Sequence, residues 1–189
     1  MENSNIDHIL VERVLSGDTN AFAVIISNTE RLVAQIVFKM VSNNEDKKDI
    51  AQDVYLKVFA KLSTFKYQAK LSTWVGQIAY NTCLNYLEKK KLVLSGIGEE
   101  DGEDQYKYPS LQWENNDVEK LFLKKELNLI IKEEIDKLPS LYKTLITLYH
   151  TEELSYAEIA QITKLPEGTL KSYLFRARKA LRDSLLKKI

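Results

Sequence analysis

Apolar side chains recur at helical spacing through most of the chain, and this pattern predicts an all-α protein. Between residues 46 and 62, apolar residues fall at positions 50, 54, 58 and 62, which places them on one face of a helix. The polar residues at the N-terminus predict a frayed start. Similar apolar patterns predict further helices at about 19–26, 31–42, 74–91, 117–137 and 140–150.

The stretch from 154 to 186 predicts two helices joined by a tight turn. Ser155 and Glu158 have the S-x-x-E spacing of a capping box, and Pro166 suits the first position of the second helix. That second helix carries basic residues outside an inward stripe of Leu170, Leu174, Ala177 and Leu181. A short helix, a turn and a longer basic helix form a DNA-binding helix-turn-helix. The alternative is a solvated basic helix on an ordinary helical bundle.

Composition excludes several classes of function. Cys83 is the single cysteine, so no internal disulfide forms, and the two histidines lie far apart, which argues against a zinc site. No phosphate-binding loop, nucleophile elbow or metal-binding helix motif is present, so neither a catalytic residue nor a cofactor is expected. The polar N-terminus and the expected lack of an apolar run of membrane-spanning length indicate a cytoplasmic protein.

The formal net charge is zero, but the charges are segregated along the chain. From 164 to 189, eight basic residues face two acidic ones, whereas from 99 to 119 eight acidic residues face Lys107 alone. Basic surfaces separated by an acidic connector are therefore expected. Because phosphate neutralisation supplies much of the affinity for DNA, a neutral chain of this kind should bind DNA weakly without a partner.

Two further faces suggest binding functions. On the 46–62 helix, Leu56 lies among polar residues and can anchor a protein interface, although a single exposed leucine on a solvated face is equally compatible. On the 74–91 helix, Trp74 shares a face with three amide residues that follow it, a combination suited to unpaired bases. Trp74 can alternatively belong to the core. The amide residues of that face are Gln77, Asn81 and Asn85.

Helical periodicity is lost between 92 and 116, where glycines and acidic residues collect. The predicted organisation is therefore two small helical domains joined by an acidic linker, with the helix-turn-helix in the second. The boundaries are 1–91 for the first domain, 92–120 for the linker and 121–189 for the second domain.

Three segments in this order resemble the extracytoplasmic-function (ECF) group of bacterial RNA polymerase sigma factors. DIAQDVYLKVFAKLSTF is similar to the group's polymerase-binding helix, and STWVGQIAYNTCLNYLEKKK to its promoter-opening and minus-ten-reading helix. LPSLYKTLITLY, LSYAEIAQI and LPEGTLKSYLFRARKALR resemble its minus-thirty-five-reading domain. The resemblance extends from about residue 18 to 186.

The resemblance implies the partners and the site residues. Core RNA polymerase is the expected protein partner, promoter DNA is bound both as duplex and as melted non-template strand, and an anti-sigma factor is expected to hold the protein inactive. The resemblance implies that the acidic linker runs towards the RNA path of the polymerase. The implied polymerase-binding residues are Asp49, Gln52, Asp53 and Leu56. The resemblance implies that residues 65–72 form a base-capture loop, which takes up a base flipped from the non-template strand. The implied minus-ten residues are Phe65, Lys66, Tyr67, Gln68, Trp74, Gln77 and Asn81. The implied minus-thirty-five residues are Lys171, Ser172, Tyr173, Phe175, Arg176, Arg178 and Lys179.

Departures from the group's usual residues affect the expected promoter preference and leave the expected fold unchanged. Gln77 and Tyr80 occupy positions where arginine is common, and Tyr173 replaces a usual arginine. Glu153 lies where glycine is frequent, and residues 66–68 read Lys-Tyr-Gln where the group often has Arg-Gly-Asp.

Two other classes of protein remain as alternatives. A self-sufficient helix-turn-helix regulator would bind duplex DNA tightly alone and would not need the tryptophan-and-amide helix. A helical adaptor or anti-sigma-binding decoy would contact protein only, so charge reversal along its last helix would be harmless.

Overall fold

The computed structural model describes residues 2–94 and 118–187, which fold as α-helices and one 3-10 turn without a strand. The all-α prediction is confirmed. Residues 95–117 of the predicted acidic linker lie outside the described residues, whereas its ends are helical: 92–94 belong to α4 and 118–120 to α5. The elements are α1 (Glu2–Leu15), α2 (Thr19–Met40), α3 (Asn44–Lys61), η1 (Leu62–Thr64), α4 (Leu71–Leu94), α5 (Val118–Asp136), α6 (Ser140–His150), α7 (Tyr156–Thr163) and α8 (Glu167–Leu185).

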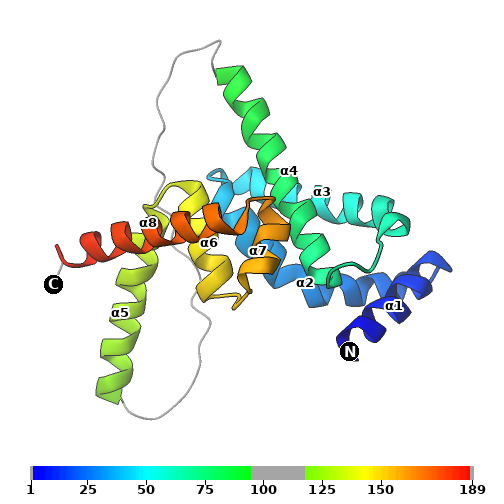
Figure 1. Cartoon of the computed structure of the whole chain (residues 1–189), viewed down its shortest axis with the longest axis horizontal. Coiled ribbons are helices and arrows are strands. Elements are labelled where there is room, and N and C mark those ends of the chain that lie inside the picture. The colour runs from blue at the N-terminus through cyan, green and yellow to red at the C-terminus, as the bar shows by residue number, and fades with distance from the viewer. Residues whose placement is uncertain (1, 95–117, 188–189) are drawn as a thin grey trace.

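Helix α2 is the centre of the fold and contacts α1, α3, α4 and α6 (Figure 1). The prediction of separate helices at 19–26 and 31–42 was wrong, because α2 continues through the polar residues between them. Thr29 is buried there, and its hydroxyl donates to the carbonyl of Ile25 at 2.7 Å, so its polar group is satisfied without ending the helix.

The apolar length of α2 also differs from expectation. An 18-residue window of α2 has a mean hydropathy of 1.4, so by length and composition this helix could cross a membrane. The expectation that no apolar run approaches that length was therefore wrong. Four surrounding helices contact α2 and cover its apolar residues, so that Ile25, Ile36 and Val37 are fully buried inside the protein.

Helix α1 was missed because its polar residues suggested a frayed terminus. Its Leu10, Val11 and Val14 are buried in the core, and α1 packs against α2. The spacing of these three residues is helical and was the available signal. The start of α4 also differs from the prediction, because neither Ser72 nor Thr73 precedes the helix as a cap: both lie inside its first turn.

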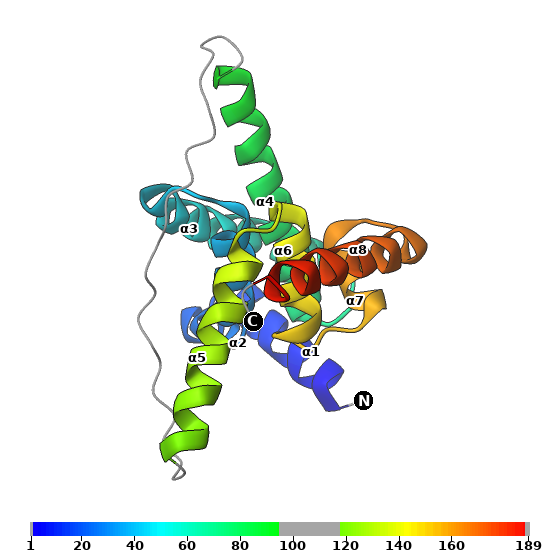
Figure 2. The same cartoon turned by 90° about the vertical axis from the view of Figure 1, so that its left-hand side faces the viewer.

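The helices before and after the linker form one continuous core (Figures 1 and 2). We call α1–α4 the N-terminal helices and α5–α8 the C-terminal helices. Helix α4 packs against α7, and α2 packs against α6, while the far ends of α4 and α5 project in opposite directions. Within the described residues, ion pairs that cross this boundary include Arg31–Glu152 at 3.0 Å, Lys39–Asp136, and Lys70–Glu158 at 2.7 Å.

The helix-turn-helix forms as the sequence predicts, with one shift. Ser155 and Glu158 make a complete capping box at the start of α7. Lys164 ends α7 in the left-handed region with φ of 58°, which turns the chain into α8. Pro166 is the residue immediately before α8 and not its first residue, because Glu167 begins the helix.

Candidate nucleic-acid and protein interfaces

The polar face of α3 is exposed along its length. Asp49, Gln52, Asp53 and Leu56 are all accessible to solvent, and Leu56 is 70% exposed. The opposite face of α3 buries Ile50, Val54 and Val58 in the core, which fixes the orientation of the helix. Lys57 pairs with Asp53 at 2.6 Å beside this face. A protruding leucine among acidic and amide groups is therefore presented on a rigid helix.

The loop after α3 and the first turns of α4 together line a cavity of about 290 Å³. Five of the predicted minus-ten residues meet there: Phe65, Lys66, Gln68, Trp74 and Gln77. Three lining residues were missed from the sequence, namely Thr64, Thr73 and Gln161, and a further one, Ala69, lies within the predicted base-capture loop. The small and hydroxyl residues gave no signal, because such residues are common in any loop. Gln161 comes from α7, so only the tertiary structure brings it here.

The aromatic rings of Phe65 and Trp74 contribute to the lining of this cavity. Phe65 is buried, and its ring centroid lies 5.2 Å from that of Trp74 and 4.8 Å from that of Tyr67. Trp74 is half-buried and packs against the core while it lines the cavity, so both interpretations of this residue from the sequence describe part of its position. Tyr67 and Asn81 are not among the lining residues.

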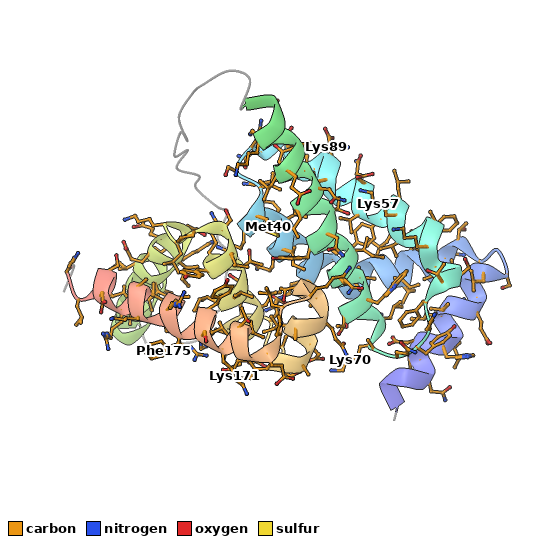
Figure 3. The ribbon with its side chains drawn as sticks, turned by 45° about the horizontal axis from the view of Figure 1, so that its top comes forward. Met40, Lys57, Lys70, Lys89, Lys171 and Phe175 are labelled. Atoms are coloured by element: carbon orange, nitrogen blue, oxygen red, sulfur yellow. The ribbon has the colours of Figure 1, made fainter. Side chains whose placement is uncertain are left out.

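The C-terminal helices approach the cavity from one side. The side-chain nitrogen of Gln77 donates to the backbone carbonyl of Gln161 at 2.9 Å. Lys70, labelled in Figure 3, pairs with Glu158 of α7. At Gly76 the helices come so close that an added Cβ would lie 3.1 Å from Ile162 Cδ1. One edge of the predicted DNA-reading face is thus occupied by α7.

This environment changes the pKa of the Glu158 carboxyl group. Burial acts to raise its pKa, but hydrogen bonds from Lys70 and Ser155 outweigh burial, and the pKa lies below its ordinary value. The ionised form is therefore favoured, which keeps both the capping box and the Lys70 ion pair intact.

Helix α8 presents a basic and aromatic surface to solvent. Phe175 points away from the other helices in Figure 3 and is 68% exposed, whereas the ammonium of Lys171 lies 5.7 Å from the ring centroid of Tyr156 in α7. Ser172, Arg176 and Lys179 are exposed on the same helix. Leu170, Leu174 and Ala177 are fully buried on its other side. This inward stripe holds α8 with its cationic residues outward, as a recognition helix requires.

Two of the predicted minus-thirty-five residues lie closer to the protein. Tyr173 is half-buried, with its ring centroid 6.0 Å from that of Tyr142. The guanidinium of Arg178 lies 4.9 Å from the ring centroid of Tyr149, and its Nε donates to Nε2 of His150 at 3.2 Å. These contacts orient Arg178 along α6.

His150 accepts this hydrogen bond in its neutral form. Burial, and secondarily the positive charge of Arg178, lower the pKa of His150. The thiol of Cys83 is fully buried, and burial raises its pKa to about 12, in agreement with a packing role for this residue. Within residues 2–94 and 118–187, no group of three or more His, Cys, Asp or Glu side chains could hold a metal ion.

Models of two sigma-factor regions match the two groups of helices. Sigma-70 region 2 matches residues 25–93, and Sigma-70 region 4 matches residues 128–181. The first match covers most of α2, all of α3 and nearly all of α4. The second match covers α6, α7 and most of α8. The fold and the two matches together place the chain in the class of sigma factors.

Relatives match nearly the whole chain. An ECF RNA polymerase sigma-E factor of Haemophilus influenzae is 35% identical over 95% of each chain. The ECF RNA polymerase sigma factor SigW of Bacillus subtilis is 32% identical over 93% of this chain and 94% of its own. The sigma-E factor of Escherichia coli K12 is 34% identical over 93% and 92%, respectively. The chain belongs to the ECF RNA polymerase sigma factors.

Solved structures support the same fold. The sigma factor RpoE of Bartonella quintana, determined with the anti-sigma factor NepR, has a TM-score of 0.70 and 21% identity, over 87% of this chain and 96% of its own. CnrH, determined with the cytosolic domain of CnrY, has a TM-score of 0.63 and 19% identity, over 97% and 98%. Because the relatives match both groups of helices, the comparisons do not favour a self-sufficient helix-turn-helix regulator.

Proposed function

We propose that this ECF sigma factor is a non-enzymatic subunit that brings core RNA polymerase to promoters by reading two DNA elements. The observation that carries the proposal is the cavity between the loop at 65–68 and α4. Its lining combines aromatic rings, amides and a lysine, which are the groups that bind unpaired bases and the adjoining phosphates.

The cavity takes one base of the melted non-template strand. Its volume of about 290 Å³ lies at the small end of ligand pockets, which suits a single base. Gln68 and Gln77 can hydrogen-bond the edge of a base, and Trp74 and Phe65 supply aromatic surface. These contacts offset the few kcal/mol that it costs to unstack a base.

Polymerase and duplex DNA bind at the two remaining surfaces. The exposed face of α3, with Leu56 at its centre, docks on core RNA polymerase, and α8 enters the major groove at the minus-thirty-five element. Lys171, Phe175 and Arg176 face the groove. Tyr173 and Arg178, which contact α6, support the orientation of α8 and lie nearer its margin.

The packed arrangement is an inactive one that opens on polymerase. Gln77 is bonded to Gln161 here, so its amide becomes available to DNA only after α7 moves away. An anti-sigma factor is the proposed partner that holds the protein inactive, since the structural relative from B. quintana was determined with such a factor. The site of action is the cytoplasm, where RNA polymerase transcribes.

A binding experiment with and without core polymerase tests this proposal. A promoter fragment with a melted minus-ten segment should be bound tightly and transcribed from a fixed start only when core polymerase is present. Trp74→Ala should weaken binding of the melted fragment by about five- to a hundredfold, as for one stacked base. Tight binding of duplex DNA without polymerase, or failure to form a complex with polymerase on gel filtration, would refute the proposal.

A further inference from the structure

Helix α1 reaches the base-capture loop although it does not line the cavity. Its apolar side packs against α2, and it also lies beside η1 and the connection between α3 and α4 (Figure 1). Two adjacent residues, Asp7 and His8, make the contacts. Asp7 contacts the start of α4 and His8 contacts the loop, so α1 touches two of the segments that line the cavity.

Asp7 caps α4 from a distant part of the sequence. Its Oδ2 accepts a hydrogen bond from the backbone nitrogen of Leu71 at 2.8 Å. Leu71 is the first residue of α4, and the first four N–H groups of a helix have no partner within the helix. A carboxylate at this end also interacts favourably with the helix dipole. Asp7 therefore supplies a cap for α4 from α1.

His8 holds the loop through a ring stack. Its ring centroid lies 4.6 Å from that of Tyr67, with an angle of 28° between the planes. Tyr67 has φ of 55°, in the left-handed region that a bulky residue rarely adopts. A conformation of this kind persists when surrounding contacts fix it. The stack on His8 is one of these contacts, and the ring of Phe65, whose centroid lies 4.8 Å from that of Tyr67, is another.

We propose that Asp7 and His8 are positioning residues that set the shape of the base-capture cavity. Tyr67 lies directly between Lys66 and Gln68, both of which line the cavity, and Leu71 begins the helix that presents Trp74 and Gln77. Loss of either contact displaces these groups by a small distance. The discrimination between bases then decreases, while binding of polymerase through α3 is retained. This inference rests on the proposed role of the cavity.

The experiment compares base preference in the holoenzyme. Asp7→Ala and His8→Ala proteins are assembled with core polymerase, and their affinities are measured for melted promoter fragments that differ in one base of the minus-ten element. The preference for the best base over the others should fall about three- to tenfold in each variant, the range expected for loss of one cap or one ring contact. Asp7→Asn and His8→Phe should retain the preference, because asparagine caps helices well and phenylalanine keeps the stack.

Controls separate positioning from simple loss of stability. Asn43→Ala removes a similar cap from α3, where Asn43 accepts from the backbone nitrogen of Glu45 at 2.9 Å. It should lower the free energy of unfolding by a comparable amount and leave base preference unchanged. The inference is overturned if Asp7→Ala and His8→Ala fold and keep the wild-type preference, or if Asn43→Ala changes the preference equally. If Trp74→Ala also has no effect on binding, the proposed function of the cavity itself fails.

Discussion

Leu56 projects from α3 with 70% of its surface exposed, whereas Val54 and Val58 on the same helix are fully buried. The apolar surface of an exposed leucine is removed from water only when a partner covers it. The acidic and amide groups around Leu56 keep the free protein hydrated at this point. We therefore expect this residue to anchor the proposed polymerase contact.

Leu56→Ala should weaken binding of core polymerase about tenfold or more without unfolding the protein, because truncation of an interface anchor removes its buried surface. Titration of labelled protein with core polymerase measures the affinity. Leu129→Ala is a matched control, since Leu129 on α5 is also an exposed leucine at 60%. Wild-type affinity of the Leu56→Ala protein would remove this residue from the interface.

His150 makes the stability of the protein depend on pH. Because its pKa is lowered in the folded state, the unfolded state binds a proton more readily, and folding stability falls as pH decreases below the ordinary histidine pKa of about 6.5. Above that pH both states are neutral at this residue and no penalty applies. His150→Gln keeps an acceptor for Arg178 but does not titrate.

The free energy of urea unfolding should therefore decrease more between about pH 7.5 and 5.5 in the wild type than in His150→Gln. Intrinsic fluorescence of the tryptophans can follow unfolding. An equal change in the two proteins would show that another group dominates this pH range.

Helices α7 and α8 show how much of an element can be predicted from sequence alone. The capping box, the turn at Lys164 and the inward stripe of α8 depend on residues close together in the sequence. The box and the turn formed as expected, and Leu170, Leu174 and Ala177 of the stripe are buried, but Leu181 is only half-buried. The cap of α4 was not predictable in this way, since Asp7 and Leu71 are 64 positions apart. Continuous α2 was missed because the hydroxyl of Thr29 is satisfied inside the helix.

Arg176→Ala should reduce promoter-specific transcription, because loss of this side chain should weaken promoter binding by about 1–3 kcal/mol. Arg176 is exposed on the proposed groove-facing side of α8. Runoff transcription from a cognate promoter, and from one with a substituted minus-thirty-five element, measures the loss. Leu174 is fully buried on the same helix, so its truncation should instead lower thermal stability. Equal transcription by the Arg176→Ala and wild-type proteins would argue against direct readout by this side chain.

The whole molecule is held in its packed arrangement by contacts between the N-terminal and C-terminal helices. Arg31 of α2 pairs with Glu152 and also donates to the carbonyl of Thr151 at 3.0 Å. Neither residue of the ion pair belongs to a proposed DNA or polymerase surface. The pair is therefore suited to a test of opening that leaves the reading residues intact.

Arg31→Ala should favour separation of the two groups of helices by about two- to fivefold, the range for loss of a partly exposed ion pair. Distance measurements between labels on α4 and α8 can follow opening. Arg13→Ala is the matched control, because it removes the Arg13–Asp18 pair, which joins α1 to the cap of α2 and does not cross the boundary. The packed arrangement does not depend on Arg31 if the two variants give the same distances.

The sequence by itself determined the all-helical class, the helix-turn-helix and the polar face of α3, because helical periodicity and local caps act within a few turns of chain. The sequence also identified most of the aromatic and amide residues of the cavity as candidate DNA-binding residues. Only the tertiary structure decided that α1 contacts the start of α4 and the loop before it, that Gln161 lines the cavity, and that α7 packs against α4. These contacts join residues far apart in the sequence, and such pairing depends on how whole helices pack together.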